Sequence, residues 1–281
     1  MTSMPSAVPG TAGSAAPHNA SGIPAPGSGT APSTLRLTLL HARYVLVETF
    51  RVPIAVIGTV VFPALALLFF VVPQRAVADD PLYATQAVIS VCVFAVMTNA
   101  LFSFGLNISE NREKPWDPYL RTLPAPGVAR VLAQILSTGA LGIVAIVPVV
   151  VIGGLFTAAE APPLRIVAGL AALAASAVPF MLIGTAVGYA FPFKAAIAVI
   201  QIVMFALAFI GGLFLPPILF ADWLDAISRF TPSRQAREFV IWAVSGGPLE
   251  WWVWVGILVW TVAMLALSLV LYQRDEGKRY R

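Results

Sequence analysis

Six long apolar segments, each free of Asp, Glu, Lys and Arg, dominate the pattern of this 281-residue chain. They cover residues 53–72, 85–109, 131–156, 166–191, 195–215 and 251–272. A helix needs about 20 apolar residues to cross the hydrocarbon core of a bilayer. Because a lone strand could not satisfy its backbone hydrogen bonds in lipid, the pattern predicts six transmembrane helices. The predicted fold class is therefore an all-α integral membrane protein.

The basic residues between these segments indicate the orientation. If both termini face the cytoplasm, 12 of the 17 Lys and Arg residues lie on that side and 5 lie outside. Cytoplasmic loops of membrane proteins carry an excess of Lys and Arg. An even number of spans also places both termini on one side. We therefore expect a multi-pass protein of the cell (plasma or inner) membrane with both termini in the cytoplasm.

The chain outside the six-span domain, residues 53–272, divides into three parts. Residues 1–34 carry no charge and are mainly Ala, Gly, Pro, Ser and Thr, which predicts a disordered tail. In residues 35–52, Leu35, Leu39, Leu46 and Phe50 recur at helical spacing, which predicts an amphipathic helix in the cytoplasmic interface. The alternative is a simple extension of the first span, although Pro53 favours a break. Residues 273–281 form a basic cytoplasmic tail.

Residues 216–250, before the sixth span, contain two amphipathic stretches, 218–230 and 233–244. Thr231 followed by Pro232 fits the start of the second helix, with Thr as its N-cap. Each stretch is too short and too charged to cross a bilayer. The pattern predicts a re-entrant helical hairpin on the outer side, or else a water-exposed cap.

Composition excludes several classes of protein. Hydrophobic residues make up 59% of the chain and charged residues only 11%, far from the balance of a soluble enzyme. The formal charge of +4 is spread over short loops, unlike the basic face of a nucleic-acid binder. The single cysteine, Cys92, allows no internal disulfide and no cysteine-based zinc site.

Candidate catalytic chemistry is also missing from the sequence. The three lysines occur in no P-loop motif, so we expect ATP and magnesium to bind to another chain. Ionisable groups are absent from all six spans, where proton- or sodium-driven transporters usually place them. We therefore predict no catalytic residue, no metal site and no cofactor in this chain, and an external energy source for any uphill transport.

The few polar residues within the spans form stripes. Asn99, Ser103 and Asn107 follow one another at intervals of four on the second span, and Gln134 and Thr138 do so on the third. Such groups turn away from lipid, either to form hydrogen bonds between helices or to line a substrate path.

The loop 110–126 between the second and third spans carries six charges of both signs around Trp116 and Tyr119. A loop that only connects two helices could be much shorter. The composition indicates a docking surface for a cytoplasmic partner, with a solvated turn that only sets topology as the alternative.

Two motifs resemble those of the permease subunits of type-2 ABC exporters, which move drugs, lipids or polysaccharide precursors. In the first, Arg112, Glu113, Leu120 and Pro124 match the pattern, while Pro115 stands where Gly is usual. The second is a Gly-x-Phe-x-Pro stretch that leads to a Trp-Leu helix and a proline: Gly212, Phe214, Pro216, Trp223, Leu224 and Pro232. The resemblance covers residues 35–272.

This resemblance implies a cytoplasmic ABC ATPase as partner and a dimer with a second permease copy or homologue. It also implies that the 110–126 loop couples the two subunits, through Glu110, Arg112, Glu113, Trp116, Tyr119, Leu120 and Arg121. We expect export of a small amphipathic or lipid-like substrate, with drug or antibiotic efflux as the first candidate. The alternatives are a lipid-modifying membrane enzyme and a passive membrane scaffold.

Overall fold

A computed structural model describes residues 34–51, 53–114 and 127–279 of the chain. The predicted disordered tail falls outside these residues, except for Thr34. The greater part of the 110–126 loop also falls outside them.

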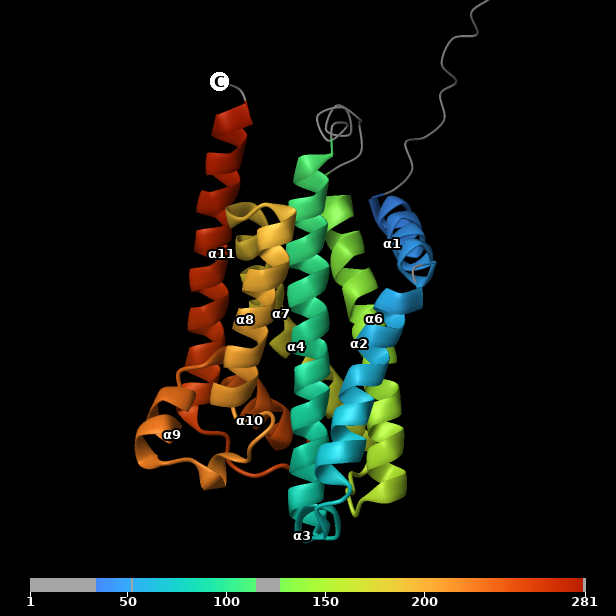
Figure 1. Cartoon of the computed structure of the whole chain (residues 1–281), viewed down its shortest axis with the longest axis vertical. Helices are drawn as coiled ribbons and strands as arrows, with labels where there is room; N and C mark the ends of the chain where they lie inside the picture. The colour runs from blue at the N-terminus through green and yellow to red at the C-terminus, as the bar shows by residue number, and fades with distance from the viewer. Residues whose placement is uncertain (1–33, 52, 115–126, 280–281) are drawn as a thin grey trace, which may run out of the picture. The chain divides into compact units, whose positions relative to one another are not determined.

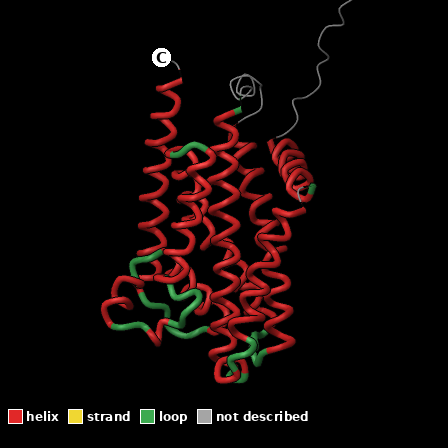
Figure 2. The backbone as a smooth tube through the Cα atoms, viewed as in Figure 1, coloured by secondary structure: helices red, strands yellow, loops and turns green. Residues whose placement is uncertain are grey.

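The described residues form helices and turns, with no strand among them (Figures 1 and 2). In chain order the elements are α1 (Thr34–Phe50), α2 (Pro53–Ala66), a π-helical turn (Leu67–Val71), α3 (Arg75–Ala78), α4 (Pro81–Glu113), α6 (Gly127–Phe156), α7 (Pro163–Ala190), α8 (Phe193–Ile210), a 3-10 turn (Pro217–Leu219), α9 (Asp222–Ser228), α10 (Pro232–Ser245) and α11 (Trp251–Arg279). The predicted all-α fold is confirmed.

Five helices of the described chain are long and apolar enough to cross a membrane. They are Pro81–Glu113, Val131–Phe156, Pro163–Ala190, Phe193–Ile210 and Trp251–Asp275, which confirms five of the six predicted spans. The first predicted span corresponds to α2 and the π-helical turn, where only the shorter apolar helix Val60–Val71 is recognised. A sixth span stays a prediction.

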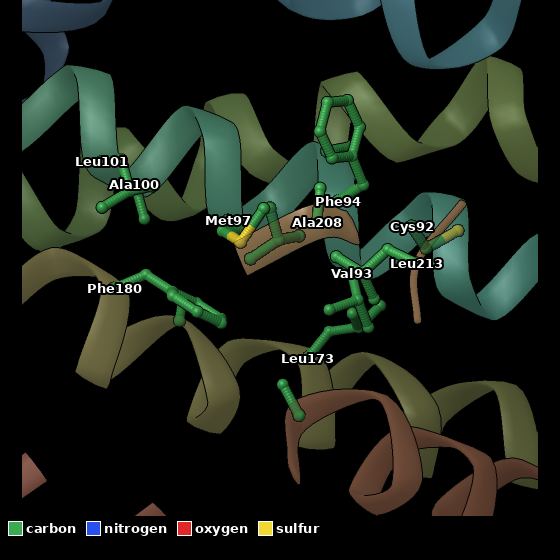
Figure 3. Close-up of a cluster of buried hydrophobic side chains, with 14 of the residues drawn as sticks. Cys92, Val93, Phe94, Met97, Ala100, Leu101, Leu173, Phe180, Ala208 and Leu213 are labelled. Carbon is green, nitrogen blue, oxygen red and sulfur yellow. The ribbon is translucent and has the colours of Figure 1, made fainter. Parts of the chain in front are cut away.

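The centre of the fold is the contact between α4 and α7. Met97, Leu101 and Phe180 lie in the space between these helices and are almost fully buried (Figure 3). Gly184 and Gly188 allow the backbones to approach, because a Cβ atom at Gly184 would lie 2.7 Å from the Leu101 carbonyl oxygen. Their spacing of four residues is the small-residue pattern that favours close helix packing in membranes.

The α1 segment confirms a helix and a break. It ends at Phe50, and a separate helix begins at Pro53. It contacts α6 and buries Thr38 and Ala42, while Leu35 and Leu39 are exposed. Its location in the cytoplasmic interface stays a prediction.

The segment 216–250 contains two short helices, and the second starts as predicted. The Thr231 hydroxyl accepts a hydrogen bond from the Arg234 backbone N–H, and Pro232 is the first residue of α10. The first helix, α9, is shorter than the predicted 218–230 because a 3-10 turn precedes it. Rather than lying apart as a loop, α10 packs against α4, α7 and α11.

The last predicted boundary differs from the structure. The sixth apolar segment ends at Tyr272 by composition, yet α11 continues as helix to Arg279. The first residues of the predicted basic tail therefore extend the helix and bring Asp275 to Arg112, next to the end of α4.

Candidate functional site

A cavity of about 610 Å³ lies among α1, α2, α4, α6 and α8. Every residue predicted for the substrate path lines it: Asn99, Ser103, Asn107, Gln134 and Thr138. Phenylalanine rings from three helices complete much of the wall, together with the amide of Gln201. Among the described lining residues, Glu110 alone carries a charge.

The polar stripes also bond the helices to one another. Asn99 Nδ2 donates to the Thr138 carbonyl oxygen at 2.7 Å, which joins α4 to α6. Ser103 Oγ donates to Asn99 Oδ1 at 3.3 Å, and Gln134 Nε2 donates to the Ser103 carbonyl oxygen at 3.4 Å. The residues that bond these helices together therefore also line the cavity, and their use as a substrate path stays a prediction.

Two hydroxyl groups at the cavity wall are buried without a hydrogen-bond partner among the described residues. They belong to Thr98 and Thr138, and Thr138 is only 2% exposed. A buried hydroxyl without a partner costs free energy, so these two groups could bind a polar atom of a ligand.

The start of the predicted coupling loop is tied to the rest of the protein. Arg112 Nε donates to Asp275 Oδ1 at 3.0 Å, and Arg112 Nη1 donates to the Gly188 carbonyl oxygen at 2.8 Å. The guanidinium also lies 5.8 Å from the ring centroid of Tyr189. One side chain thereby joins the end of α4 to α7 and α11.

The neighbouring residues of this loop extend that connection. Glu113 Oε1 accepts a hydrogen bond from the backbone N–H of Phe193, the first residue of α8, at 2.8 Å. Lys114 and Glu110 form a partly exposed ion pair at 3.0 Å. The other predicted coupling residues, Trp116, Tyr119, Leu120 and Arg121, lie outside the described residues.

A second arginine cluster lies at the opposite end of α4, where α3 and α9 also lie (Figure 1). Arg237 of α10 is 4% exposed. Its Nε donates to Ser90 Oγ at 2.8 Å, and its Nη2 donates to Gln86 Oε1 at 3.1 Å. Its Nη1 pairs with Glu238 at 2.7 Å. Burial lowers the pKa of the Arg237 guanidinium, and the Glu238 carboxylate opposes that shift.

The second sequence motif forms the turn that leads from α8 towards α9. Gly212 has φ of +74°, and a Cβ atom there would lie 2.6 Å from Pro217 Cγ, so glycine suits this position. The Phe214 ring packs 4.8 Å from that of Phe94. Pro216 precedes the 3-10 turn, Trp223 is exposed on α9, and Leu224 is half-buried beside it.

Sequence reasoning missed the partners of both arginines. Gln86 and Ser90 are four residues apart on α4, the same spacing that identified the stripe from Asn99 to Asn107. This spacing is visible in the sequence, but it involves only two residues. Asp275 gave no signal, because it lies beyond the last apolar segment.

Comparison with known proteins agrees with this layout. The family described as "ABC-2 type transporter" matches residues 37–244, more than half of the chain. A protein of Bacillus subtilis (strain 168), named "Putative transport permease YvfS", is 22% identical over 224 residues, covering 79% of this chain and 91% of that protein. The chain belongs to the ABC-2 type transporter family.

Proposed function

We propose that this chain is the membrane-spanning subunit of an ATP-driven exporter, and that the cavity among α1, α2, α4, α6 and α8 belongs to its substrate path. The observation that carries the proposal is the lining of that cavity. Aromatic rings lie there beside neutral amides and hydroxyls, and Glu110, the one charged group among the described lining residues, is paired with Lys114. Such a surface suits an amphipathic or lipid-like molecule better than a strongly anionic one.

The first span is part of the proposal. α2 and the following π-helical turn together cover 19 residues, or about 28 Å of helix at 1.5 Å per residue. This length is close to the thickness of the hydrocarbon core. With α2 as a sixth span, both termini lie on the cytoplasmic side that the basic loops favour.

Energy would come from a separate cytoplasmic ATPase that docks on the 110–126 loop. Arg112 and Glu113, at the start of this loop, bond to α7, α8 and α11. A displacement of the loop would therefore reach three helices through short polar contacts. Two permease copies, each with its loop on an ATPase, would complete the exporter.

The hairpin of α9 and α10 would close the path on the outer side. α10 contacts α4 and α8, two of the helices that surround the cavity. A movement of these helices would thus change the packing beneath the hairpin.

A reconstituted complex tests the proposal. The permease and its cognate ABC ATPase are placed in liposomes, and ATP-dependent movement of fluorescent amphiphiles is measured. Ser103→Phe, which places a ring in the cavity and narrows it, should reduce transport about tenfold or more, whereas Ile143→Phe on the exposed face of α6 should not. Trp116→Ala should lower both transport and ATP hydrolysis.

These variants separate the parts of the proposal. If Ser103→Phe and Ile143→Phe transport equally well, the cavity is not the path. Should Trp116→Ala keep full ATP-coupled transport, the docking role of the loop is refuted.

A further inference from the structure

A second cavity, of about 690 Å³, forms a groove between α9 and α11. Trp251, Trp252 and Trp260 of α11 line one wall, and Asp222 and Arg229 line the other. The groove is separate from the cavity assigned to transport and shares no lining residue with it. The transport function proposed above therefore gives this groove no role.

The groove extends from the start of α11 into the apolar helix. From Trp251 to Trp260 the helix rises by about 14 Å. The headgroup layer of a bilayer is only about 5–8 Å thick on each side. Tryptophan favours this boundary between headgroups and hydrocarbon. An occupant that fits the whole groove must combine a polar head with the first part of a hydrocarbon chain, as a membrane lipid does.

The charge of the groove favours a cation in that head. Asp225 is already neutralised, since it pairs with Arg229 at 2.7 Å and lies 3.6 Å from Arg234. Asp222 is exposed and has no ion pair among the described residues. The uncompensated charge at the groove is thus the carboxylate of Asp222.

A buried amide adds a requirement for a hydrogen-bond donor. Gln235 lines the groove and is 3% exposed. Its Nε2 donates to the Arg229 carbonyl oxygen at 2.9 Å, which fixes the orientation of the amide because a carbonyl needs a donor. Its Oε1 is buried and has no partner in the described part of the chain. A ligand that satisfies this oxygen must carry an N–H or O–H group.

The backbone of α11 leaves the space for this amide. A Cβ atom at Gly256 would overlap the Gln235 side chain, so the glycine lets the amide lie directly against α11. The unpaired oxygen is therefore held in a packed position rather than on a mobile surface side chain.

We propose that this groove binds a membrane lipid whose headgroup carries a primary ammonium, with phosphatidylethanolamine as the probe. The ammonium donates to Gln235 Oε1 and pairs with Asp222, and the tryptophans cover the upper part of the acyl chains. A quaternary ammonium offers the same charge but no N–H donor. This site does not depend on the transport function proposed above.

Native mass spectrometry of the purified full chain tests this site without any ATPase. Delipidated protein is titrated with phosphatidylethanolamine, phosphatidylcholine or phosphatidylglycerol of identical acyl chains. We expect phosphatidylethanolamine to bind about tenfold more tightly than either other lipid, as one charge-assisted hydrogen bond implies. Equal affinities, or tighter binding of phosphatidylcholine to the aromatic wall, would overturn the proposal.

Two variants locate the preference. Gln235→Met and Asp222→Asn should each bring phosphatidylethanolamine close to the affinity of phosphatidylcholine, while Asp79→Asn, at the exposed residue directly after α3, should leave the preference intact. Asp222 is exposed, so its substitution tests the site even if Gln235→Met fails to fold. A preference that survives Asp222→Asn shows that the ammonium binds elsewhere.

Discussion

The two ends of α4 are each held by an arginine, but the two contacts differ in burial and in what they join. At the hairpin end, Arg237 of α10 is 4% exposed and bonds to Gln86 and Ser90. At the other end, the side chain of Arg112 is 22% exposed and bonds to Asp275 of α11. The sealed contact is suited to fix the fold. The partly exposed contact lies at the start of the predicted coupling loop, where breaking it leaves charged groups that water can reach.

The largest loss of stability is expected when the buried contact of Arg237 at the hairpin end is removed. Arg237→Leu removes the donors for Gln86, Ser90 and one contact of Glu238, and should lower the free energy of unfolding by about 3 kcal/mol. SDS titration of the protein in mild detergent micelles measures this loss. Arg75→Leu, on an exposed ion pair at the same end, should cost less than about 0.5 kcal/mol. Equal losses in the two variants would show that Arg237 is not an anchor.

The sequence predicted the apolar helices well because five of them satisfy a simple length and polarity criterion. It could not predict which helix faces the core. The membrane-spanning window of α4 is 78% buried and that of α11 only 11%, yet both are comparably apolar. The difference arises from the neighbours of each helix, because α4 packs against α2, α6, α7, α8 and α10, whereas α11 packs against α7 and α10. The hydropathy of a helix carries no information on how many neighbours surround it.

In the candidate site, too, the sequence predicted some features and missed others. Asn99, Ser103 and Asn107 could be grouped by their helical spacing, and the structure places them on one cavity. The anchor between Arg112 and Asp275 joins residues 163 positions apart, which spacing along one helix cannot reveal. Local periodicity therefore found the stripe, and only the packing of α11 against α7 revealed the anchor.

A smaller effect is expected at the exposed end. In a double-mutant cycle of Arg112→Gln and Asp275→Asn, the coupling energy should be about 1–2 kcal/mol, because the pair is partly shielded from water. The same cycle for Lys114 and Glu110 should give at most about 0.5 kcal/mol, since that pair is more exposed. Both cycles are read from the free energy of unfolding. A coupling energy near zero for the Arg112–Asp275 pair would show that this contact does not hold the start of the coupling loop.

A still smaller effect on stability than at either arginine is expected between the two ends, at Asn99. Its Nδ2 donates to the Thr138 carbonyl oxygen, and hydrogen bonds between membrane helices contribute on average about 0.6 kcal/mol. Asn99→Leu should therefore cost roughly that amount in SDS titration, far less than Arg237→Leu.

The effect of Asn99→Leu on transport should be larger, because the change removes an amide from the cavity wall and with it a contact for polar groups of the substrate. We expect the apparent affinity for amphiphiles that carry hydrogen-bonding groups to fall about tenfold, with little change for purely apolar ones. Thr185→Val on α7 provides the control, since its hydroxyl bonds within its own helix and it does not line the cavity. If Asn99→Leu loses 3 kcal/mol of stability and transports all amphiphiles with unchanged relative affinities, Asn99 is a third anchor of α4 and not part of the substrate path.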